Sequence, residues 1–191
     1  DKEYSGQNEH TRRFDECQDC HNEHSLEVRF EECSDCHENV DITSAADVRM
    51  IRADEDLLDA DPVDYDGDGD VTEPIESEIQ SFHDALLVAI QSYAADTLGT
   101  AIIYDSASYP YWFIDGNGNG VTDEGEVSGD TRYASWTPTL LRAAYNYQYA
   151  AKDPGAFAHN PRYIMQVMYD SIEAIGGEDA VATFTRPEIL D

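Results

Sequence analysis

The sequence predicts a mainly α fold with long irregular loops and few short strands. Three stretches after residue 74 carry apolar residues at helical spacing. Between them lie long segments rich in Gly, Asp, Asn and Pro, which are typical of loops. A third observation is that cysteine is confined to two motifs near the N-terminus. These two motifs are the strongest indication of which cofactor the first forty residues bind.

The two motifs read C-x-x-C-H and begin at Cys17 and Cys33. Two thiols at this spacing reach the two vinyl groups on one edge of a porphyrin, and the next histidine lies under the iron as proximal ligand. The alternatives are a four-cysteine zinc site and two disulfides, but a C-x2-C zinc site needs no histidine after each pair. We predict two covalently bound haem c groups, held by Cys17, Cys20, His21, Cys33, Cys36 and His37.

Residues 1–40 form the predicted dihaem segment. This segment is polar, so it cannot bury enough apolar surface alone, and its fold should depend on the porphyrins. Residues 41–191 form the predicted helical domain, with two calcium loops, that packs on the haems. Within it, residues 41–63 are acidic with scattered aliphatic residues, which indicates a loop with one short helix.

Carboxylates alternate with glycines in residues 64–76. Calcium takes six to eight oxygen ligands, and glycines let the backbone wrap around it. An EF-hand reading from Asp66 needs a one-residue deletion, whereas a reading from Asp64 places Gly69 at position 6 but Ile75 at position 12. The register stays open, and an acidic turn without metal is the alternative. The candidate ligands are Asp64, Asp66, Asp68, Asp70, Glu73 and Glu76.

The clearest helical pattern runs from Ile75 to Thr97, with Gly99 as its stop signal. His83 lies on the apolar stripe of this helix, together with Ile79, Leu86 and Ile90. The segments 101–104 and 109–114 are β-branched or aromatic and predict short strands.

A second acidic loop, residues 115–126, follows the EF-hand spacing without a gap. Gly120 falls at position 6, and oxygen donors fall at positions 1, 3, 5, 7, 9 and 12. The flanking segments lack the helix pattern of a true EF-hand, so we expect an isolated loop, again with a metal-free acidic turn as the alternative. Together the loops predict two calcium ions; the ligands of the second are Asp115, Asn117, Asn119, the Val121 carbonyl, Asp123 and Glu126.

Two further helices are predicted near the C-terminus, because Thr137-Pro138 and Asn160-Pro161 are both helix-start signals. The first stops near residues 153–155, and the second ends at residues 176–177. In the first, one face carries Leu141, Tyr145 and Tyr149, which are four residues apart.

Four of the six histidines remain for two distal positions. This surplus favours bis-histidine ligation; methionine at position 50, 165 or 168 is the alternative and would raise the potential. His24 lies too close to His21 to ligate the same iron, so it would serve a neighbouring haem or one of another subunit. A lone histidine on an apolar stripe, such as His83, is usually a core residue. His159 directly precedes a helix start, a rigid position that can orient an imidazole toward an iron. The distal candidates are His159, His24, His83 and His10.

Asp and Glu total 41 against 11 Lys and Arg, a net charge of −30. Such a chain repels nucleic acid and anionic lipid, which both need basic patches. No apolar run is long enough to span a membrane. Haem attachment to C-x-x-C-H takes place outside the cytoplasmic membrane, so we expect a periplasmic, extracellular or cell-surface protein whose export signal is already removed, or a piece of a longer chain.

The motif pair in residues 17–37 resembles the paired modules of multihaem c-type cytochromes. Residues 136–172 resemble the C-terminal part of large polyhaem cytochromes from environmental bacteria. The resemblance implies bis-histidine electron-transfer haems and an extracytoplasmic site, and His159-Asn160-Pro161 resembles a distal-ligand segment. Multihaem cytochromes that polymerise into extracellular conducting filaments are similar as well.

These features predict an electron-transfer protein and not an enzyme. Its partners would be other cytochromes or redox proteins, and it would form a homo-oligomer or filament whose haems make a relay. One alternative is a haem enzyme, a peroxidase or oxyanion reductase, with one open iron site; the surplus histidines argue against it. The other is a calcium-stabilised structural or adhesion module that carries haem incidentally.

Overall fold

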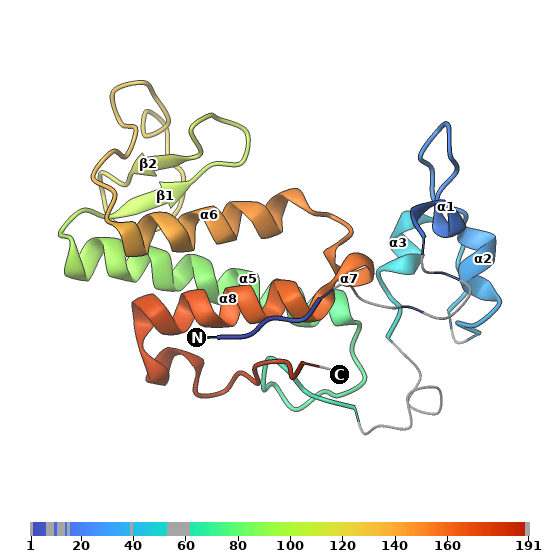
Figure 1. Cartoon of the computed structure of the whole chain (residues 1–191). Coiled ribbons are helices and arrows are strands. Elements are labelled where there is room, and N and C mark those ends of the chain that lie inside the picture. Colours follow the sequence, from blue (N-terminus) through green and yellow to red (C-terminus); the bar gives the residue numbers. More distant parts are fainter. Residues whose placement is uncertain are drawn as a thin grey trace. The chain divides into compact units, whose positions relative to one another are not determined.

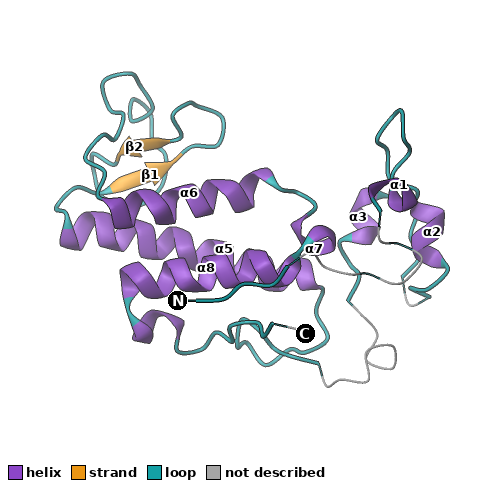
Figure 2. Cartoon of the chain, in the orientation of Figure 1, coloured by secondary structure: helices purple, strands orange, loops and turns teal. Residues whose placement is uncertain are grey.

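The computed structural model describes residues 2–6, 10, 14, 16–38, 40–52 and 62–189. Within these residues the chain is mainly helical with one two-stranded sheet, in agreement with the predicted class (Figures 1 and 2). The helices are α1 (Cys17–Cys20), α2 (Phe30–Ser34), α3 (Ala45–Val48), α5 (Ile75–Ser92), α6 (Pro138–Lys152), α7 (Ala156–His159) and α8 (Pro161–Gly176), with a π-helical turn (Tyr93–Thr97) and a 3-10 turn (Glu178–Val181); the strands are β1 (Ile102–Tyr104) and β2 (Trp112–Ile114).

The chain divides into two compact units, each assembled from separate segments. Unit 1 comprises residues 1–81, 154–166 and 183–191, and unit 2 comprises residues 82–153 and 167–182. The predicted division at residue 40 stays a prediction.

Unit 1 joins both ends of the chain to α8 through one buried amide. The Gln166 side chain is fully buried, and its Oε1 accepts a hydrogen bond from the Ser5 amide at 2.7 Å. Its Nε2 donates to the carbonyl oxygen of Pro187 at 2.9 Å. Because a buried amide without partners is costly, these bonds fix the N-terminal and C-terminal segments on the same helix.

The short helix expected between residues 41 and 63 is α3. Ser44 caps it, because its side-chain oxygen accepts a hydrogen bond from the Asp47 amide. None of the residues of α1, α2 or α3 is fully buried in the chain alone. The predicted dependence of residues 1–40 on the porphyrins stays a prediction.

The core of unit 2 lies on the predicted apolar stripe of α5. Phe82, Leu86 and Ile90 are fully buried, as are Met168 and Ile172 of α8. On α6, Thr137 caps the helix as predicted, and the buried residues are Leu140, Ala143, Ala144 and Tyr147.

The two predicted strands pair as an antiparallel hairpin in unit 2, with Ile103 opposite Phe113. Both residues are 1% exposed. The hairpin matters for function because the second acidic loop begins directly after β2.

A stripe on the outer face of α6 is left exposed. Leu141, Tyr145 and Tyr149 share this face, as their spacing predicts, and are 50%, 68% and 42% exposed. The buried residues of α6 lie on a neighbouring face of the helix. The helix therefore carries apolar side chains both toward the core and toward solvent.

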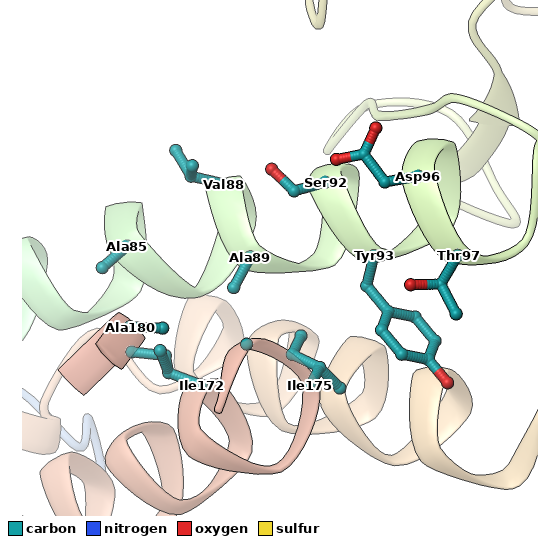
Figure 3. A pocket seen from close by; sticks show the side chains of 11 residues that line it. Ala85, Val88, Ala89, Ser92, Tyr93, Asp96, Thr97, Ile172, Ile175 and Ala180 are labelled. Carbon is teal, nitrogen blue, oxygen red and sulfur yellow. The ribbon is translucent and has the colours of Figure 1, made fainter. Parts of the chain in front are cut away.

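Unit 2 also contains a groove of about 510 Å³. It lies between the second half of α5 with its π-helical turn and the end of α8 (Figure 3). Its lining is mostly alanine, valine and isoleucine, without cysteine or histidine. The groove is therefore separate from the predicted haem ligands.

Candidate haem and metal sites

Each C-x-x-C-H motif folds as one helical turn. The His21 amide donates to the Cys17 carbonyl at 2.9 Å, and the His37 amide donates to the Cys33 carbonyl at 3.0 Å. This turn places the two cysteines of a motif, three residues apart, on one side of the helix. All four cysteines are free thiols. Covalent attachment of a haem at each motif stays a prediction.

Two of these thiols lie in surroundings that disfavour the thiolate. Burial is the main cause that raises the pKa of the Cys20 and Cys33 thiols. The nearby carboxylates of Asp19 and Glu32 raise the pKa of Cys20 further. Among the described residues, no group of three or more candidate metal ligands within 4.8 Å of one another includes a cysteine, so the four-cysteine zinc site gains no support.

Each proximal histidine faces a second imidazole in unit 1. The ring centroids of His21 and His159 are 6.3 Å apart, and those of His37 and His10 are 5.9 Å apart. Metal–imidazole bonds of about 2 Å, with the size of the ring, place two imidazoles on opposite sides of one metal about 6 Å apart between centroids. The centroid separation of each pair matches this value, with the ring planes inclined at 47° for His21 and His159 and at 63° for His37 and His10.

His21 is also oriented from its other ring nitrogen. Its Nδ1 lies 2.9 Å from the carbonyl oxygen of Leu26. A metal-binding histidine commonly donates its second ring N–H to such a carbonyl, which fixes the tautomer and the ring orientation. In this arrangement Nε2 is the His21 ring nitrogen that could ligate a metal.

His83 has a different environment, inside unit 2. Its ring stacks on Tyr147 with 3.9 Å between centroids and 17° between planes, and its Nε2 lies 3.2 Å from the Tyr147 carbonyl oxygen. Burial lowers the pKa of His83, although the Tyr147 carbonyl and Asp84 oppose this. These contacts describe a half-buried histidine that packs against Tyr147 and whose charged form is disfavoured.

His24 lies at an exposed turn that follows the first motif. The side-chain oxygen of Asn22 accepts hydrogen bonds from the amides of His24 and Ser25, at 3.0 and 3.1 Å. Among the methionines, Met165 and Met168 are fully buried in α8, and Met50 is 60% exposed. Of the four distal candidates, His24, His10 and His159 are exposed in the chain alone, and His83 is half-buried.

The second acidic loop wraps its backbone around Asp115. This carboxylate is 6% exposed and accepts hydrogen bonds from the amides of Gly118 and Gly120 at 2.6 and 2.8 Å. Burial opposes ionisation, but these amides hold the pKa of Asp115 below its usual value. Glu126, at position 12, accepts a hydrogen bond from the Gly116 amide at 2.8 Å. The loop therefore closes between its second and twelfth positions.

The first loop repeats this backbone pattern in the register that starts at Asp64. The Asp64 carboxylate accepts from the amides three and five residues on, those of Gly67 and Gly69, at 2.6 and 2.8 Å. Gly69 has a φ of +96° and Gly120 a φ of +79°, the left-handed region that glycine adopts without strain. The hydrogen bonds thus equate Asp64 with Asp115, so no deletion is needed.

Glu78 closes the first loop in place of Ile75. Its Oε2 accepts hydrogen bonds from the amides of Tyr65 and Asp66, both at 2.9 Å, and Tyr65 stands where Gly116 stands in the second loop. The sequence analysis missed Glu78 because it lies beyond position 12, on α5. One sequence signal was present: Glu78 precedes the apolar Phe82 by four residues and so shares its helical face.

Buried Glu78 is neutralised by Arg52. The side chain is 0% exposed, and its Oε1 lies 2.9 Å from Nη1 of Arg52. Burial raises the pKa of Glu78, and Arg52 partly opposes this rise. Arg52 also donates to the carbonyl oxygens of Val63 at 2.5 Å and Glu73 at 2.6 Å, which ties the start and end of the loop to the helix.

The carboxylates of the first loop gather in two overlapping groups. Ligand atoms of Asp64, Asp66 and Asp68 lie within 4.8 Å of one another, as do those of Asp66, Glu73 and Glu78. Glu73 Oε1 is buried and has no hydrogen-bond partner among the described residues. Of the predicted ligands, Glu76 instead forms an ion pair with Arg49. Oxygen donors in this arrangement fit a hard divalent cation.

Comparison with curated proteins finds similarity to polyhaem cytochromes. The chain is 28% identical over 137 residues to C-type polyheme cytochrome OmcB of Geobacter sulfurreducens, which covers 60% of this chain and 18% of that protein. It is 29% identical over 97 residues to C-type polyheme cytochrome OmcC of the same species, which covers 47% of this chain and 12% of that protein. The chain therefore matches less than a fifth of the length of these relatives.

No family model and no solved structure matches the chain. In the described part of the chain, no helix combines the length and the apolar character needed to cross a membrane. The similarities to OmcB and OmcC, added to the two motifs, support a protein like the multihaem c-type cytochromes.

The half-buried His83, whose pKa is lowered by desolvation, predicts that stability falls with acidification. Its folded pKa lies below the unfolded value of about 6.5, so its stabilising contribution is complete above that pH and is lost as pH falls through the folded pKa. In chemical denaturation between pH 8 and 5, His83→Leu should lessen this loss by up to about 1.4 kcal/mol per pH unit. His24→Leu is the control; equal pH dependence of His83→Leu and wild type would contradict the assignment.

Proposed function

We propose that the chain is a dihaem c-type cytochrome that transfers electrons and is not an enzyme. Haem 1 is attached to Cys17 and Cys20, and haem 2 to Cys33 and Cys36. The observation that carries the proposal is the spacing of imidazoles: His21 with His159, and His37 with His10, each about 6 Å between centroids. The polyhaem names of the relatives support haem as the cofactor.

Haem supplies one-electron chemistry when bound. The residues contribute by holding the iron, since two imidazoles fill both axial positions and leave no site for a substrate. A histidine pair also sets a lower potential than a histidine–methionine pair. The two motifs lie in one unit, where the Arg29 amide donates to the Cys20 carbonyl at 2.8 Å, so the two attachment segments are in contact. This proximity suits electron exchange between the haems.

The alternative function is a haem peroxidase or oxyanion reductase. It requires one iron whose distal position is open to a small molecule. The pairing of both proximal histidines argues against that, and so do the core contacts of His83, which leave it unsuited to act as a mobile ligand. A structural module with incidental haem is the third function, and it gives no reason for two imidazole pairs.

The proposed setting is extracytoplasmic, at the periplasmic, extracellular or cell-surface side, with other cytochromes or redox proteins as partners. A net charge of −30 suits docking on basic partners. We further propose self-assembly into an oligomer or filament. With both of the chain's own haems ligated within unit 1, the exposed His24 is free of an intrachain iron and is placed to serve a haem of a neighbouring chain.

We also propose that each acidic loop binds one calcium ion. Crowded carboxylates repel one another unless a cation compensates them. The ligands proposed for the first loop are Asp64, Asp66, Asp68, Glu73 and Glu78, with Asp70 contributing its backbone carbonyl at position 7; those of the second are Asp115, Asn117, Asn119, Val121 through its carbonyl, Asp123 and Glu126.

Ligation predicts how histidine variants alter the haem spectra. Wild-type protein should carry two covalent haems, both low-spin. His159→Ala and His10→Ala should each convert one haem to high-spin, as measured by electron paramagnetic resonance and optical spectra, because each removes one axial ligand. His24→Ala should keep both low-spin signals. Retention of both signals in His159→Ala and His10→Ala would refute the pairing, and a high-spin haem in wild type would favour the enzyme.

Calcium binding predicts that Glu78 matters more than Glu76. Chelation should lower the melting temperature, and calcium at about 100 times its Kd should restore roughly 2.7 kcal/mol of stability per site. In calorimetric titrations, Asp64→Asn and Glu78→Gln should weaken one site, Asp115→Asn should weaken the other, and Glu76→Gln should change neither. Binding that is unaffected by Glu78→Gln would exclude it as a ligand, and absent binding would exclude the calcium proposal.

Self-assembly predicts species larger than a monomer in sedimentation at micromolar protein with calcium and moderate salt. Repulsion between subunits of charge −30 is screened over about 8 Å at physiological salt, so assembly should increase as salt is raised. His24→Ala should reduce assembly without loss of intrachain low-spin haem. A monomer-sized species under all these conditions would leave a soluble diffusing carrier as the function.

A further inference from the structure

We propose that Gly155 and Arg49 are positioning residues that together orient the His159 imidazole toward haem 1. This inference rests on the proposed ligation of haem 1 by His159. In this proposal neither Gly155 nor Arg49 ligates the iron or contacts the haem. Both residues act by placing the His159 ring.

Gly155 provides the space in which the His159 ring lies. A Cβ at residue 155 would be 2.6 Å from Cε1 and 2.9 Å from Nδ1 of that ring. The φ of Gly155 is −105°, which any residue can adopt, so the backbone conformation does not require glycine. The requirement is for space, since the helical turn brings residue 155 and residue 159 together, with the His159 amide donating to the Gly155 carbonyl at 2.9 Å.

Arg49 holds the segment that carries this ring. Its Nη2 donates to the carbonyl oxygen of Pro154 at 2.8 Å, directly before Gly155. Its guanidinium carbon lies 5.2 Å from the centroid of the Phe157 ring, within the range of a cation–π contact. Its Nη1 pairs with Glu76 of α5. One side chain thus contacts the turn before α7, α7 itself and the first turn of α5.

The helix α7 needs such contacts because it is only four residues long. An isolated helix of this length is unstable, since forming the first turn is unfavourable. In α7, Ala156 is the one residue that is fully buried. The orientation of His159 therefore depends on the space at Gly155 and on the three contacts of Arg49, which a lysine cannot reproduce because its ammonium lacks the planar fork.

The Gly155 part is tested with a matched pair of glycine-to-alanine variants. Gly155→Ala should displace the imidazole, lower the low-spin fraction of haem 1 and speed carbon monoxide binding to that ferrous haem. We expect about tenfold or more, as is typical when a residue that orients a metal ligand is removed. Gly6→Ala is the control, because a Cβ there meets no atom within 4 Å. The haem 2 spectrum is an internal control for folding.

The Arg49 part is tested with Arg49→Met and Arg49→Lys. Arg49→Met should speed carbon monoxide binding at haem 1, whereas Arg49→Lys should restore part of the wild-type behaviour by keeping the charge near Glu76. A purely structural role would lower the melting temperature and alter both haems alike. If Gly155→Ala behaves as Gly6→Ala and Arg49→Met as wild type, the positioning proposal is overturned.

His159→Ala separates this failure from failure of the proposed ligation. If His159→Ala opens haem 1 while the Gly155 and Arg49 variants leave it closed, only the positioning role is wrong. If His159→Ala leaves haem 1 low-spin with unchanged carbon monoxide binding, the ligation by His159 is wrong, and the positioning role fails with it.

Discussion

The axial demand of each proposed haem iron governs how unit 1 is built. The proximal histidine comes from the same helical turn as the two cysteines, so local sequence supplies it. The distal histidine must come from elsewhere and be held about 6 Å from the first ring, between centroids. For haem 1 the proposed distal residue is His159, far along the chain, and this ligation would require the N-terminal segment and α7 to fold into one unit, as they do. The contacts of Gln166 with Ser5 and Pro187 serve the same requirement, because they tie both chain ends to α8.

Local signals predicted α3, α5, α6, α8, the two strands and the spacing of the second acidic loop, but not α1, α2 or α7. Apolar spacing over 75–97 corresponds to α5 with its π-helical turn, and the Thr137-Pro138 signal corresponds to the start of α6. These features depend on residues a few positions apart, which a sequence displays directly. The regular loop at 115–126 likewise needed only its own spacing.

The distal histidines and the closure of the first loop depend on tertiary contacts, which sequence spacing does not contain. His10 and His24 both lie in polar segments close to a motif, yet only His10 faces a proximal ring. Glu78 replaces Ile75 because the helix that follows the loop returns a carboxylate to the amides of Tyr65 and Asp66. The one sequence signal for the burial of Glu78 is its spacing of four residues from the apolar Phe82.

The scarcity of basic residues gives Arg49 and Arg52 a connected role. Only 11 lysines and arginines serve 41 acidic residues, and two of them, three residues apart, bind Glu76 and Glu78 on the first turn of α5. Arg52 fixes the carboxylate that closes the first loop, whereas Arg49 reaches from the same turn to Pro154 and Phe157. The proposed calcium loop and the distal-ligand segment of haem 1 therefore share one helical turn as a support. The second loop lies in unit 2, where no such arginine connects it to a haem ligand among the described contacts. A cation bound at the first loop would thus act on the surroundings of His159, whereas one bound at the second would act on the hairpin of unit 2.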